Sequence, residues 1–309
     1  MPAHRRKHVL NLTPKGSAVL SLVLPKGSLE NQVLELFAGA DLSVIRGGDR
    51  DYAARIDDPR IDRVRFLRPQ EIPTYVEQGI FDLGISGRDW ITETEADVVS
   101  LGEIGGGRAG EAVVSVVLAV PKESPWNSVR DLPDGVRIST EMPETTKRFL
   151  EEHGIKGRVF TSHGATEAKI PDIVDAIVDL TETGSSLRKA GLKVIETLLT
   201  SRTELLANRA SYDDPAKRAA MEDVALLLQG ALRARGHVLL KLNVPVDSLD
   251  AVLKVLPSMS SPTVMPLAAG DLRAVETVVP KRGVNTLLPA LRGAGARDIL
   301  ELPISKIIE

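Results

Sequence analysis

A short polar segment that follows an apolar run carries most of the residues that could do chemistry. The run Ile177–Leu180 contains Asp179, and residues 181–187 read Thr-Glu-Thr-Gly-Ser-Ser-Leu. We expect a buried strand, a tight turn and a helix that begins at Ser186 or Leu187. Such a turn presents backbone N–H groups and hydroxyls at the positive end of a helix dipole, which suits a phosphate dianion.

The carboxylate of Asp179 suits a different part of a ligand. A carboxylate accepts hydrogen bonds and therefore matches sugar hydroxyls rather than a phosphate. Together the strand and the turn predict a site for a ribose 5-phosphate. Taken alone, the same residues also fit an ordinary strand–turn–helix joint that is capped by Ser or Thr.

This segment and its neighbours resemble the phosphoribosyl-diphosphate (PRPP) signature of the ATP phosphoribosyltransferase family. The matching positions are Gly164, Glu167, Asp175, Ile177, Asp179, Leu180, Thr183, Gly184, Leu187, Gly191 and Leu192. The family usually has Thr in place of Ser186, and Lys169 and Ile170 stand in a segment that is often small and apolar. Because Ser186 keeps a hydroxyl, the phosphate chemistry survives this difference.

Four further motifs resemble the same family in the same order. They are Leu-Pro-Lys-Gly-Ser-Leu at 24–29, Leu-Arg-Pro-Gln-Glu-Ile-Pro at 67–73, Asp-Leu-Gly-Ile-Ser-Gly-Arg-Asp at 82–89 and Thr-Glu-Met-Pro at 140–143. Met142 stands where the family has Tyr, so an aromatic contact there is lost. The segment from Leu239 to Ile308 resembles the regulatory domain of the family's long form. The resemblance therefore covers about Val19 to Ile308.

The resemblance implies a reaction and a set of site residues. N1 of the ATP adenine attacks the anomeric carbon of PRPP, and pyrophosphate leaves from a ribose with oxocarbenium character. We expect catalysis by positioning and electrostatics. The expected catalytic residues are Asp179, Glu167 and Lys26. The expected PRPP site comprises Asp175, Asp179, Thr181, Thr183, Gly184, Ser185, Ser186 and Leu187. The expected ATP contacts are Lys26, Arg68 and Asp89.

Plainer interpretations of several of these residues stay open at this point. Asp175 also fits a surface carboxylate on a helix, and Asp89 fits a helix N-cap before Trp90. Lys26 and Arg68 also fit ordinary surface cations. Arg46, Arg50 and Arg55 are plausible contacts of the nucleotide triphosphate but equally suit a solvated loop.

The resemblance also implies a cofactor, an inhibitor and an assembly. Mg²⁺ would screen the pyrophosphate, and because oxygen atoms of substrate and water suffice as its ligands, we expect no metal site built from protein side chains. L-Histidine is the implied inhibitor, with Asn243 and Thr263 at its site. Since Asn243 stands where some members have a carboxylate, we expect weakened histidine binding. The implied assembly is a homo-oligomer, a hexamer alongside dimers.

Composition excludes several other classes of protein. The 309 residues carry a formal net charge of −3, which argues against a dedicated nucleic-acid binder. The absence of Cys excludes disulfides, thiolate catalysis and thiolate zinc sites. The five His residues show no ligand spacing outside the basic N-terminus. No apolar run approaches the roughly 18 residues of a membrane span, and no signal peptide is recognised. We therefore expect a cytoplasmic protein without membrane contact.

Alternating strands and helices predict an α/β fold with parallel sheets. The expected architecture is a two-lobed catalytic unit like a periplasmic binding protein, followed by a ferredoxin-like regulatory domain. Residues 1–110, completed by about 200–235, form lobe I, residues 111–199 form lobe II with the PRPP loop, and residues 236–309 form the regulatory domain. Expected helices include Pro171–Asp175 and a long one over Pro215–Arg235.

The tail from Val238 has the order β-α-β-β-α-β, which is typical of small-ligand sensors but equally of a plain oligomerisation module. Two other functions fit parts of the pattern. Two α/β lobes around a cleft also describe solute-binding proteins, although the phosphate loop counts against that class. A metabolite sensor that has lost its activity is a third possibility, which Asp179 and the Thr-Gly turn disfavour.

Overall fold

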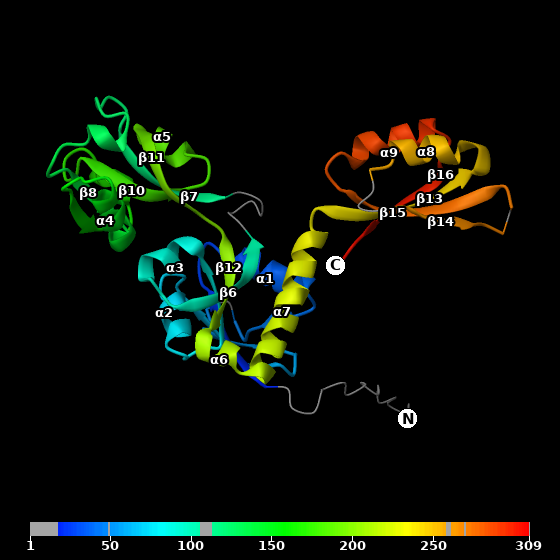
Figure 1. Ribbon diagram of the computed structural model, residues 1–309, viewed down its shortest axis with the longest axis horizontal. Helices are drawn as coiled ribbons and strands as arrows, with labels where there is room; N and C mark the ends of the chain where they lie inside the picture. Colours follow the sequence, from blue (N-terminus) through cyan, green and yellow to red (C-terminus); the bar gives the residue numbers. More distant parts are fainter. Residues whose placement is uncertain (1–17, 49, 106–112, 258–260, 269, 309) are drawn as a thin grey trace. The chain divides into compact units, whose positions relative to one another are not determined.

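The structure is a computed structural model that describes residues 18–48, 50–105, 113–257, 261–268 and 270–308 (Figure 1). It divides into two compact units. The first unit comprises Met1–Glu35 and Leu42–Ala225, and the second comprises Leu36–Asp41 and Leu226–Glu309. Helices α1 (Glu30–Gly39) and α7 (Pro215–Ala234) contribute residues to both units.

A seven-stranded sheet forms one half of the first unit, in the order β2-β3-β4-β1-β5-β12-β6. Its strands are β1 (Leu20–Pro25), β2 (Val44–Ile45), β3 (Ala53–Ile56), β4 (Ile61–Leu67), β5 (Leu83–Gly87), β6 (Val98–Gly105) and β12 (Thr203–Asn208). Its helices include α2 (Ile72–Glu77), α3 (Arg88–Thr94) and α6 (Arg209–Asp213). Every residue of β1 is buried, and β1 runs parallel to β4 and β5. Pro25, Leu67 and Gly87 therefore lie at the same edge of the sheet.

A five-stranded sheet in the order β11-β7-β10-β8-β9 forms the other half. Its strands are β7 (Val114–Pro121), β8 (Arg137–Thr140), β9 (Arg158–Thr161), β10 (Ala176–Thr181) and β11 (Leu192–Ser201). Helix α4 (Pro143–Glu152) follows β8, and helix α5 (Ser185–Lys189) follows β10. Strands β8, β9 and β10 are parallel, whereas β7 pairs antiparallel with β10 and β11.

The predicted helix over Pro171–Asp175 is wrong. The chain instead forms a 3-10 helix at Thr166–Lys169 and then turns. The N–H of Asp175 already donates to the carbonyl oxygen of Arg137 on the neighbouring strand, at 2.9 Å. Because this N–H is bonded to the adjacent strand, it cannot also bond to a carbonyl four residues earlier, as a helix would require. The residues left between the 3-10 helix and β10 are too few to form a helix.

Helix α3 joins the two halves of the first unit. Trp90 is 8% exposed and packs into the hydrophobic core of the five-stranded sheet. The carboxylate of Glu93 accepts hydrogen bonds from the N–H groups of Glu144 (2.9 Å) and Thr145 (2.8 Å) at the start of α4. These N–H groups have no partner within their own helix, and a negative charge stabilises that end of a helix dipole. Residues on α3 are thereby fixed relative to both sheets.

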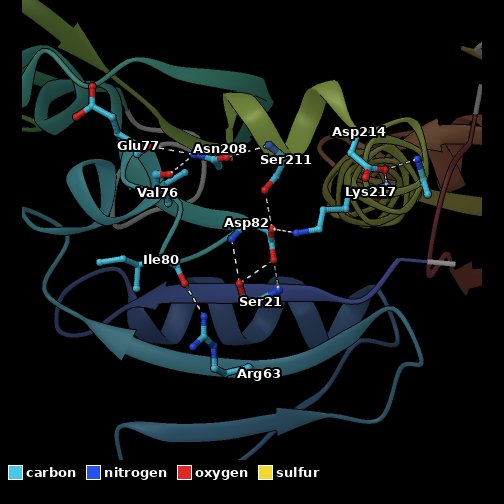
Figure 2. Close-up of polar contacts among 11 residues, drawn as sticks. Ser21, Arg63, Val76, Glu77, Ile80, Asp82, Asn208, Ser211, Asp214 and Lys217 are labelled. Atoms are coloured by element: carbon cyan, nitrogen blue, oxygen red, sulfur yellow. Dashed lines mark hydrogen bonds and ion pairs between the residues drawn. The ribbon is translucent and has the colours of Figure 1, made fainter.

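A buried carboxylate holds α6 and the start of α7 on the seven-stranded sheet (Figure 2). Asp82 precedes β5 and accepts hydrogen bonds from the N–H and hydroxyl of Ser21, both at 2.8 Å, and from the hydroxyl of Ser211 at 2.7 Å. Lys217 forms an ion pair with it at 2.6 Å. Burial alone would raise the pKa of Asp82, but these bonds outweigh it and hold the pKa below its ordinary value. Since Ser21 and Asp82 lie at the starts of their strands, this anchor is at the edge opposite Pro25 and Gly87.

The second unit folds as β13 (His237–Pro245), α8 (Leu249–Val255), β14 (Thr263–Pro266), β15 (Leu272–Pro280), α9 (Val284–Gly293) and β16 (Arg297–Pro303). The strands form an antiparallel sheet in the order β14-β15-β13-β16. Figure 1 shows both helices on one face of this sheet. Alternate residues of β13, from Val238 to Val244, are buried on that face. This is the ferredoxin-like order, so the predicted fold class is confirmed.

Candidate functional site

A pocket of about 440 Å³ lies in the first unit, where residues from both sheets meet. The end of β10 and the following loop line it with Leu180, Thr181, Glu182, Thr183, Ser185 and Ser186. The seven-stranded sheet contributes Ser28 and Leu29, which follow β1, and Gly87, Asp89 and Trp90 around the start of α3. The hydroxyl-rich segment therefore faces the edge at which β1, β4 and β5 end.

The loop after β10 has a left-handed residue at its centre. Gly184 has φ of 69° and is the N-cap of α5, which begins at Ser185, one residue before the earliest predicted start. Its N–H donates to the hydroxyl of Thr181 at 2.8 Å, which closes the turn. A side chain at Gly184 would be strained at this φ, and its Cβ would lie 2.9 Å from Nη1 of Arg188.

Asp179 lies among carboxylates at the edge of this loop. Its Oδ1 accepts a hydrogen bond from the N–H of Leu180 at 2.7 Å. Burial raises the pKa of Asp179, and the neighbouring charges of Glu167 and Glu141 raise it further. The sequence predicted Glu167 but missed Glu141. The signal for Glu141 was present, because it belongs to the Thr140–Pro143 motif at the end of β8, the strand next to β10.

The turn that carries Glu167 is tied to the sheet by hydroxyls and one lysine. The hydroxyls of Ser162 and Thr166 lie 3.0 Å apart. Nζ of Lys169 donates to the hydroxyl of Ser162 at 2.5 Å and to that of Ser139 at 3.2 Å. Lys169 therefore fixes the turn to β8 through these two hydrogen bonds. It stands where the resembled family usually has a small residue.

The structure does not bring Asp175 to this group. Asp175 precedes β10, so along an extended strand it is about 13 Å from Asp179. Its carboxylate accepts hydrogen bonds from the backbone N–H of Arg137 at 2.9 Å and from the guanidinium at 3.0 and 2.6 Å. The bonds from Arg137 hold the pKa of Asp175 below its ordinary value. Its local role is an ion pair at the start of two parallel strands.

Asp89 lies in the first turn of α3, on the wall of the pocket opposite the loop. The N-cap of α3 is Gly87, so an N-cap role for Asp89 is excluded. Asp89 is 5% exposed, and its Oδ1 accepts a hydrogen bond from the hydroxyl of Ser201 at 2.5 Å. Burial raises the pKa of Asp89, although the bond from Ser201 acts in the opposite direction.

Basic side chains gather around the turn that follows β1. Nζ of Lys26 lies 3.3 Å from the carboxylate of Glu30, and the guanidinium of Arg46 lies 2.7 Å from the same group. Nη1 of Arg68 lies 3.7 Å from the position of a Cβ at Gly27. Lys26 and Arg68 thus flank Gly27, whose neighbours Ser28 and Leu29 line the pocket.

Met142, at the position of the missing Tyr, is 2% exposed within the core of the five-stranded sheet.

In the second unit, Asn243 and Thr263 lie on the face of the sheet that the helices leave uncovered. Asn243 pairs with Ala274, and Thr263 pairs with Glu276, on the strand between them. Nδ2 of Asn243 donates to Oδ2 of Asp298 at 2.9 Å.

Two negative findings concern only the part of the chain that the structure describes. Within it, no three His, Asp or Glu side chains are grouped so that they could hold a metal ion. Within the same residues, no helix is long and apolar enough to cross a membrane.

Comparison with known sequences finds two family profiles in this chain. The profile described as ATP phosphoribosyltransferase matches residues 68–230, and the profile described as the HisG C-terminal domain matches residues 234–306. The ATP phosphoribosyltransferase of Pelotomaculum thermopropionicum is 47% identical over 291 residues, which are 94% of this chain and 99% of that relative. That of Chlorobium phaeovibrioides is 46% identical over 293 residues, with 94% and 98% covered.

A solved structure agrees with these sequences over part of the chain. It is the ATP phosphoribosyl transferase (HisG:HisZ) complex from Thermotoga maritima, with a TM-score of 0.56 and 28% identity. The match covers 98% of that chain but 67% of this one, so a third of this chain lies outside it.

Proposed function

Because this chain belongs to the ATP phosphoribosyltransferase family, whose reaction of ATP with PRPP opens histidine biosynthesis, we propose that the pocket of the first unit is the site of that reaction. The observation that carries the assignment is the lining of the pocket. Thr181, Thr183, Ser185 and Ser186 stand on one side of it, and Ser28 and Asp89 stand on the other. A hydroxyl-rich loop facing a second wall can hold two substrates against each other.

In this proposal the loop over Thr181–Leu187 binds the 5-phosphate of PRPP. The left-handed Gly184 turns the chain so that the next N–H groups begin a helix without partners inside it. Hydroxyls of Thr183, Ser185 and Ser186 supplement them. Asp179 and Glu167 accept hydrogen bonds from the ribose hydroxyls. Asp175 is left out of this site because Arg137 occupies its carboxylate at the other end of β10.

ATP occupies the opposite wall in this proposal. Lys26 and Arg68 contact its phosphates or those of PRPP, and Asp89 contacts the nucleotide. As N1 of the adenine forms its bond to the anomeric carbon, the bond from that carbon to the diphosphate oxygen breaks, and pyrophosphate leaves with the electron pair. Asp179 and Glu167 stabilise the positive charge that develops on the ribose, and Lys26 stabilises the negative charge that develops on pyrophosphate.

Mg²⁺ is the cofactor that we propose for this reaction. We expect phosphate oxygens and water to supply most of its ligands. When bound, Mg²⁺ neutralises the diphosphate of PRPP. The chain's own contribution is to bind and orient the sugar through the Thr181–Leu187 loop and Asp179.

We propose further that the second unit binds free L-histidine and inhibits the enzyme. The match of residues 234–306 to the HisG C-terminal domain and the uncovered sheet face with Asn243 and Thr263 support this regulation. The proposed assembly is a homo-oligomer, a hexamer alongside dimers. We place the reaction in the cytoplasm, where cells keep ATP and PRPP.

The direct test is the ultraviolet absorbance increase that accompanies formation of phosphoribosyl-ATP. The full chain should produce it only when ATP, PRPP and a magnesium salt are all present. Release of one pyrophosphate per product, measured in parallel with a coupled assay, is the second expected result. Binding of PRPP without product formation would instead identify a sensor or a solute-binding protein and would reject the assignment.

A further inference from the structure

The hydroxyl of Ser201 forms two hydrogen bonds with Asp89 on the wall of the pocket, although the sequence did not single Ser201 out. We propose that Ser201 is a positioning residue of the nucleotide site, which holds the carboxylate of Asp89 in place as a hydrogen-bond acceptor for ATP. The inference rests on the proposed function, in which Asp89 contacts the nucleotide. Ser201 therefore acts through Asp89 and not on the reacting atoms.

The two hydrogen bonds fix the direction of the hydroxyl. The N–H of Asp89, in the first turn of α3 where N–H groups lack helical partners, donates to Oγ of Ser201 at 3.0 Å. The same hydroxyl donates to Oδ1 of Asp89 at 2.5 Å, because an ionised carboxylate can only accept. Ser201 is 3% exposed and Asp89 is 5% exposed, so little water is available to replace this donor.

The backbone places Ser201 beside Asp89. The pairing of β5 with β12 ends at Gly87. The next N–H along the chain, that of Arg88, donates to the carbonyl oxygen of Arg202 at 2.9 Å. One further step along both segments brings Asp89 to Ser201, the last residue of β11. Arg202 alone separates β11 from β12, so the backbones of both sheets fix the position of the hydroxyl.

Gly87 leaves the space that the carboxylate of Asp89 occupies. A Cβ at Gly87 would clash with Oδ1 of Asp89 and would lie 3.1 Å from Oγ of Ser201. The φ of Gly87 is −76°, which any residue adopts, so this position calls for glycine because of space. The carboxylate therefore turns back over Gly87 to meet Ser201, and all three residues line the pocket.

The hydroxyl of Ser201 also favours the ionised form of Asp89. Burial raises the pKa of Asp89, and the hydrogen bond from Ser201 acts in the opposite direction, as do the N–H groups of Asp89 and Trp90. An ionised carboxylate accepts stronger hydrogen bonds than a neutral carboxyl group does. It therefore suits an amino or hydroxyl group of the nucleotide and not its phosphates.

Neighbouring charges do not supply this stabilisation. The charged side chains on the segments around Asp89 are Arg88, Glu93, Glu182, Arg202 and Glu204. Arg88 lies 3.6 Å from Glu204, and Glu93 is bonded to the start of α4. Among the described residues, the hydroxyl of Ser201 is the one side chain that lowers the pKa of Asp89.

The test measures binding of ATP, with a magnesium salt, to the full chain by titration calorimetry between about pH 4 and pH 8. ATP affinity should fall on the acid side, where Asp89 takes up a proton. Ser201→Ala removes the donor to Oδ1, so the fall should move to higher pH by about one unit. PRPP affinity should stay unchanged in Ser201→Ala, because the proposed PRPP loop lies on the opposite wall of the pocket.

Ser86→Ala is the matched control. Ser86 is a fully buried residue of β5, and its hydroxyl donates to the carbonyl oxygen of Pro69 at 2.9 Å. Its removal also deletes one buried hydrogen bond but should leave the pH dependence of ATP binding unchanged. A second comparison uses Asp89→Asn, which has no carboxylate to ionise. Adding Ser201→Ala to that variant should cause no further shift.

An acid fall at the same pH in wild type and Ser201→Ala would overturn the role of Ser201. The same conclusion would follow if Ser201→Ala shifted the fall as strongly in the Asp89→Asn background. If ATP bound with the expected shift but ATP and PRPP gave no product, the proposed reaction would be rejected while the role of Ser201 would stand.

Discussion

Three carboxylates from three separate segments of the chain lie beside the loop after β10. Asp179 lies on β10, Glu141 follows β8, and Glu167 lies on the 3-10 turn. Burial and the two like charges raise the pKa of Asp179. The ionised form of Asp179 is therefore less stable in the folded protein than in water. Hydrogen bonds from ribose hydroxyls, or a positive charge that develops on the ribose, would stabilise this ionised form.

We expect Asp179→Asn to lower kcat/KM for PRPP by at least about tenfold, because it removes a charge-assisted hydrogen bond worth about 1.5–3 kcal/mol. Its thermal midpoint should stay the same or rise, because a group with a raised pKa destabilises the fold when it is ionised. Steady-state kinetics and calorimetry measure the two effects.

Asp175→Asn is the matched control, with an unchanged KM for PRPP and a stability loss of up to about 1 kcal/mol. Equal kinetics for wild type and Asp179→Asn would remove Asp179 from the site.

Glu141→Gln tests the coupling between the carboxylates. Removing one neighbouring negative charge lowers the pKa of Asp179, so the fall of kcat/KM for PRPP on the acid side should move to lower pH. The pH profiles of wild type and variant, recorded with the same substrates, cancel the titration of the phosphates. A shift of the acid limb to higher pH would contradict the arrangement, as would no shift at all.

At the scale of elements, the joint between β10 and α5 depends on one backbone conformation. Gly184→Ala forces a side chain into the left-handed region, at a cost of about 1–2 kcal/mol in the free energy of unfolding. It also crowds Arg188, so the loop should shift and the KM for PRPP should rise several-fold. Urea unfolding and PRPP-dependent kinetics measure these two effects.

Gly154→Ala provides the comparison for this variant. Gly154 also has φ of 69°, and no atom lies within 4 Å of a Cβ placed there. Its stability loss should match that of Gly184→Ala, whereas its KM for PRPP should not change. If both variants bound PRPP with wild-type affinity, the phosphate site would lie elsewhere.

The anchor of α6 and α7 should make the first unit sensitive to acid. Because its folded pKa is depressed, Asp82 contributes stability that is fully present above its unfolded pKa of about 4 and is lost as the pH falls through the folded value. Lys217→Met removes one cause of the depression, and the stability loss at neutral pH should be about 1.5–3 kcal/mol. Acid unfolding should then begin at higher pH. Urea titrations between pH 7 and about pH 3 test this, and identical acid midpoints would contradict it.

At the scale of the whole molecule, we propose that catalysis and regulation belong to different units. Histidine should therefore inhibit without competing with PRPP, and saturating PRPP should not abolish the inhibition.

Thr263→Ala should weaken inhibition several-fold, because it removes a hydroxyl from the proposed histidine site. Thr286→Ala, on helix α9 at the covered face of the sheet, should leave it unchanged. Inhibition curves for the three proteins decide this, and equal curves for wild type and Thr263→Ala would remove Thr263 from the site.

Features that depend on contiguous residues were available from the sequence. The apolar run before Thr181, the small polar residues after it and the apolar pattern from Leu187 on are enough to predict a strand, a turn and a helix. The β-α-β-β-α-β order of the second unit follows from the same local periodicities. Backbone conformation and the apolar periodicity of one segment depend mainly on its own residues, which is why these predictions succeed.

The neighbours of each functional group were decided only by the tertiary structure. The sequence placed Asp175 in the PRPP site and did not single out Glu141, but β8 runs parallel to β10, so Asp175 meets Arg137 at one end and Glu141 approaches Asp179 at the other. Trp90 enters the core of the five-stranded sheet, and Asp298 reaches Asn243 through a one-residue bulge. These contacts depend on strand order and register between segments far apart in the chain, which no local pattern encodes.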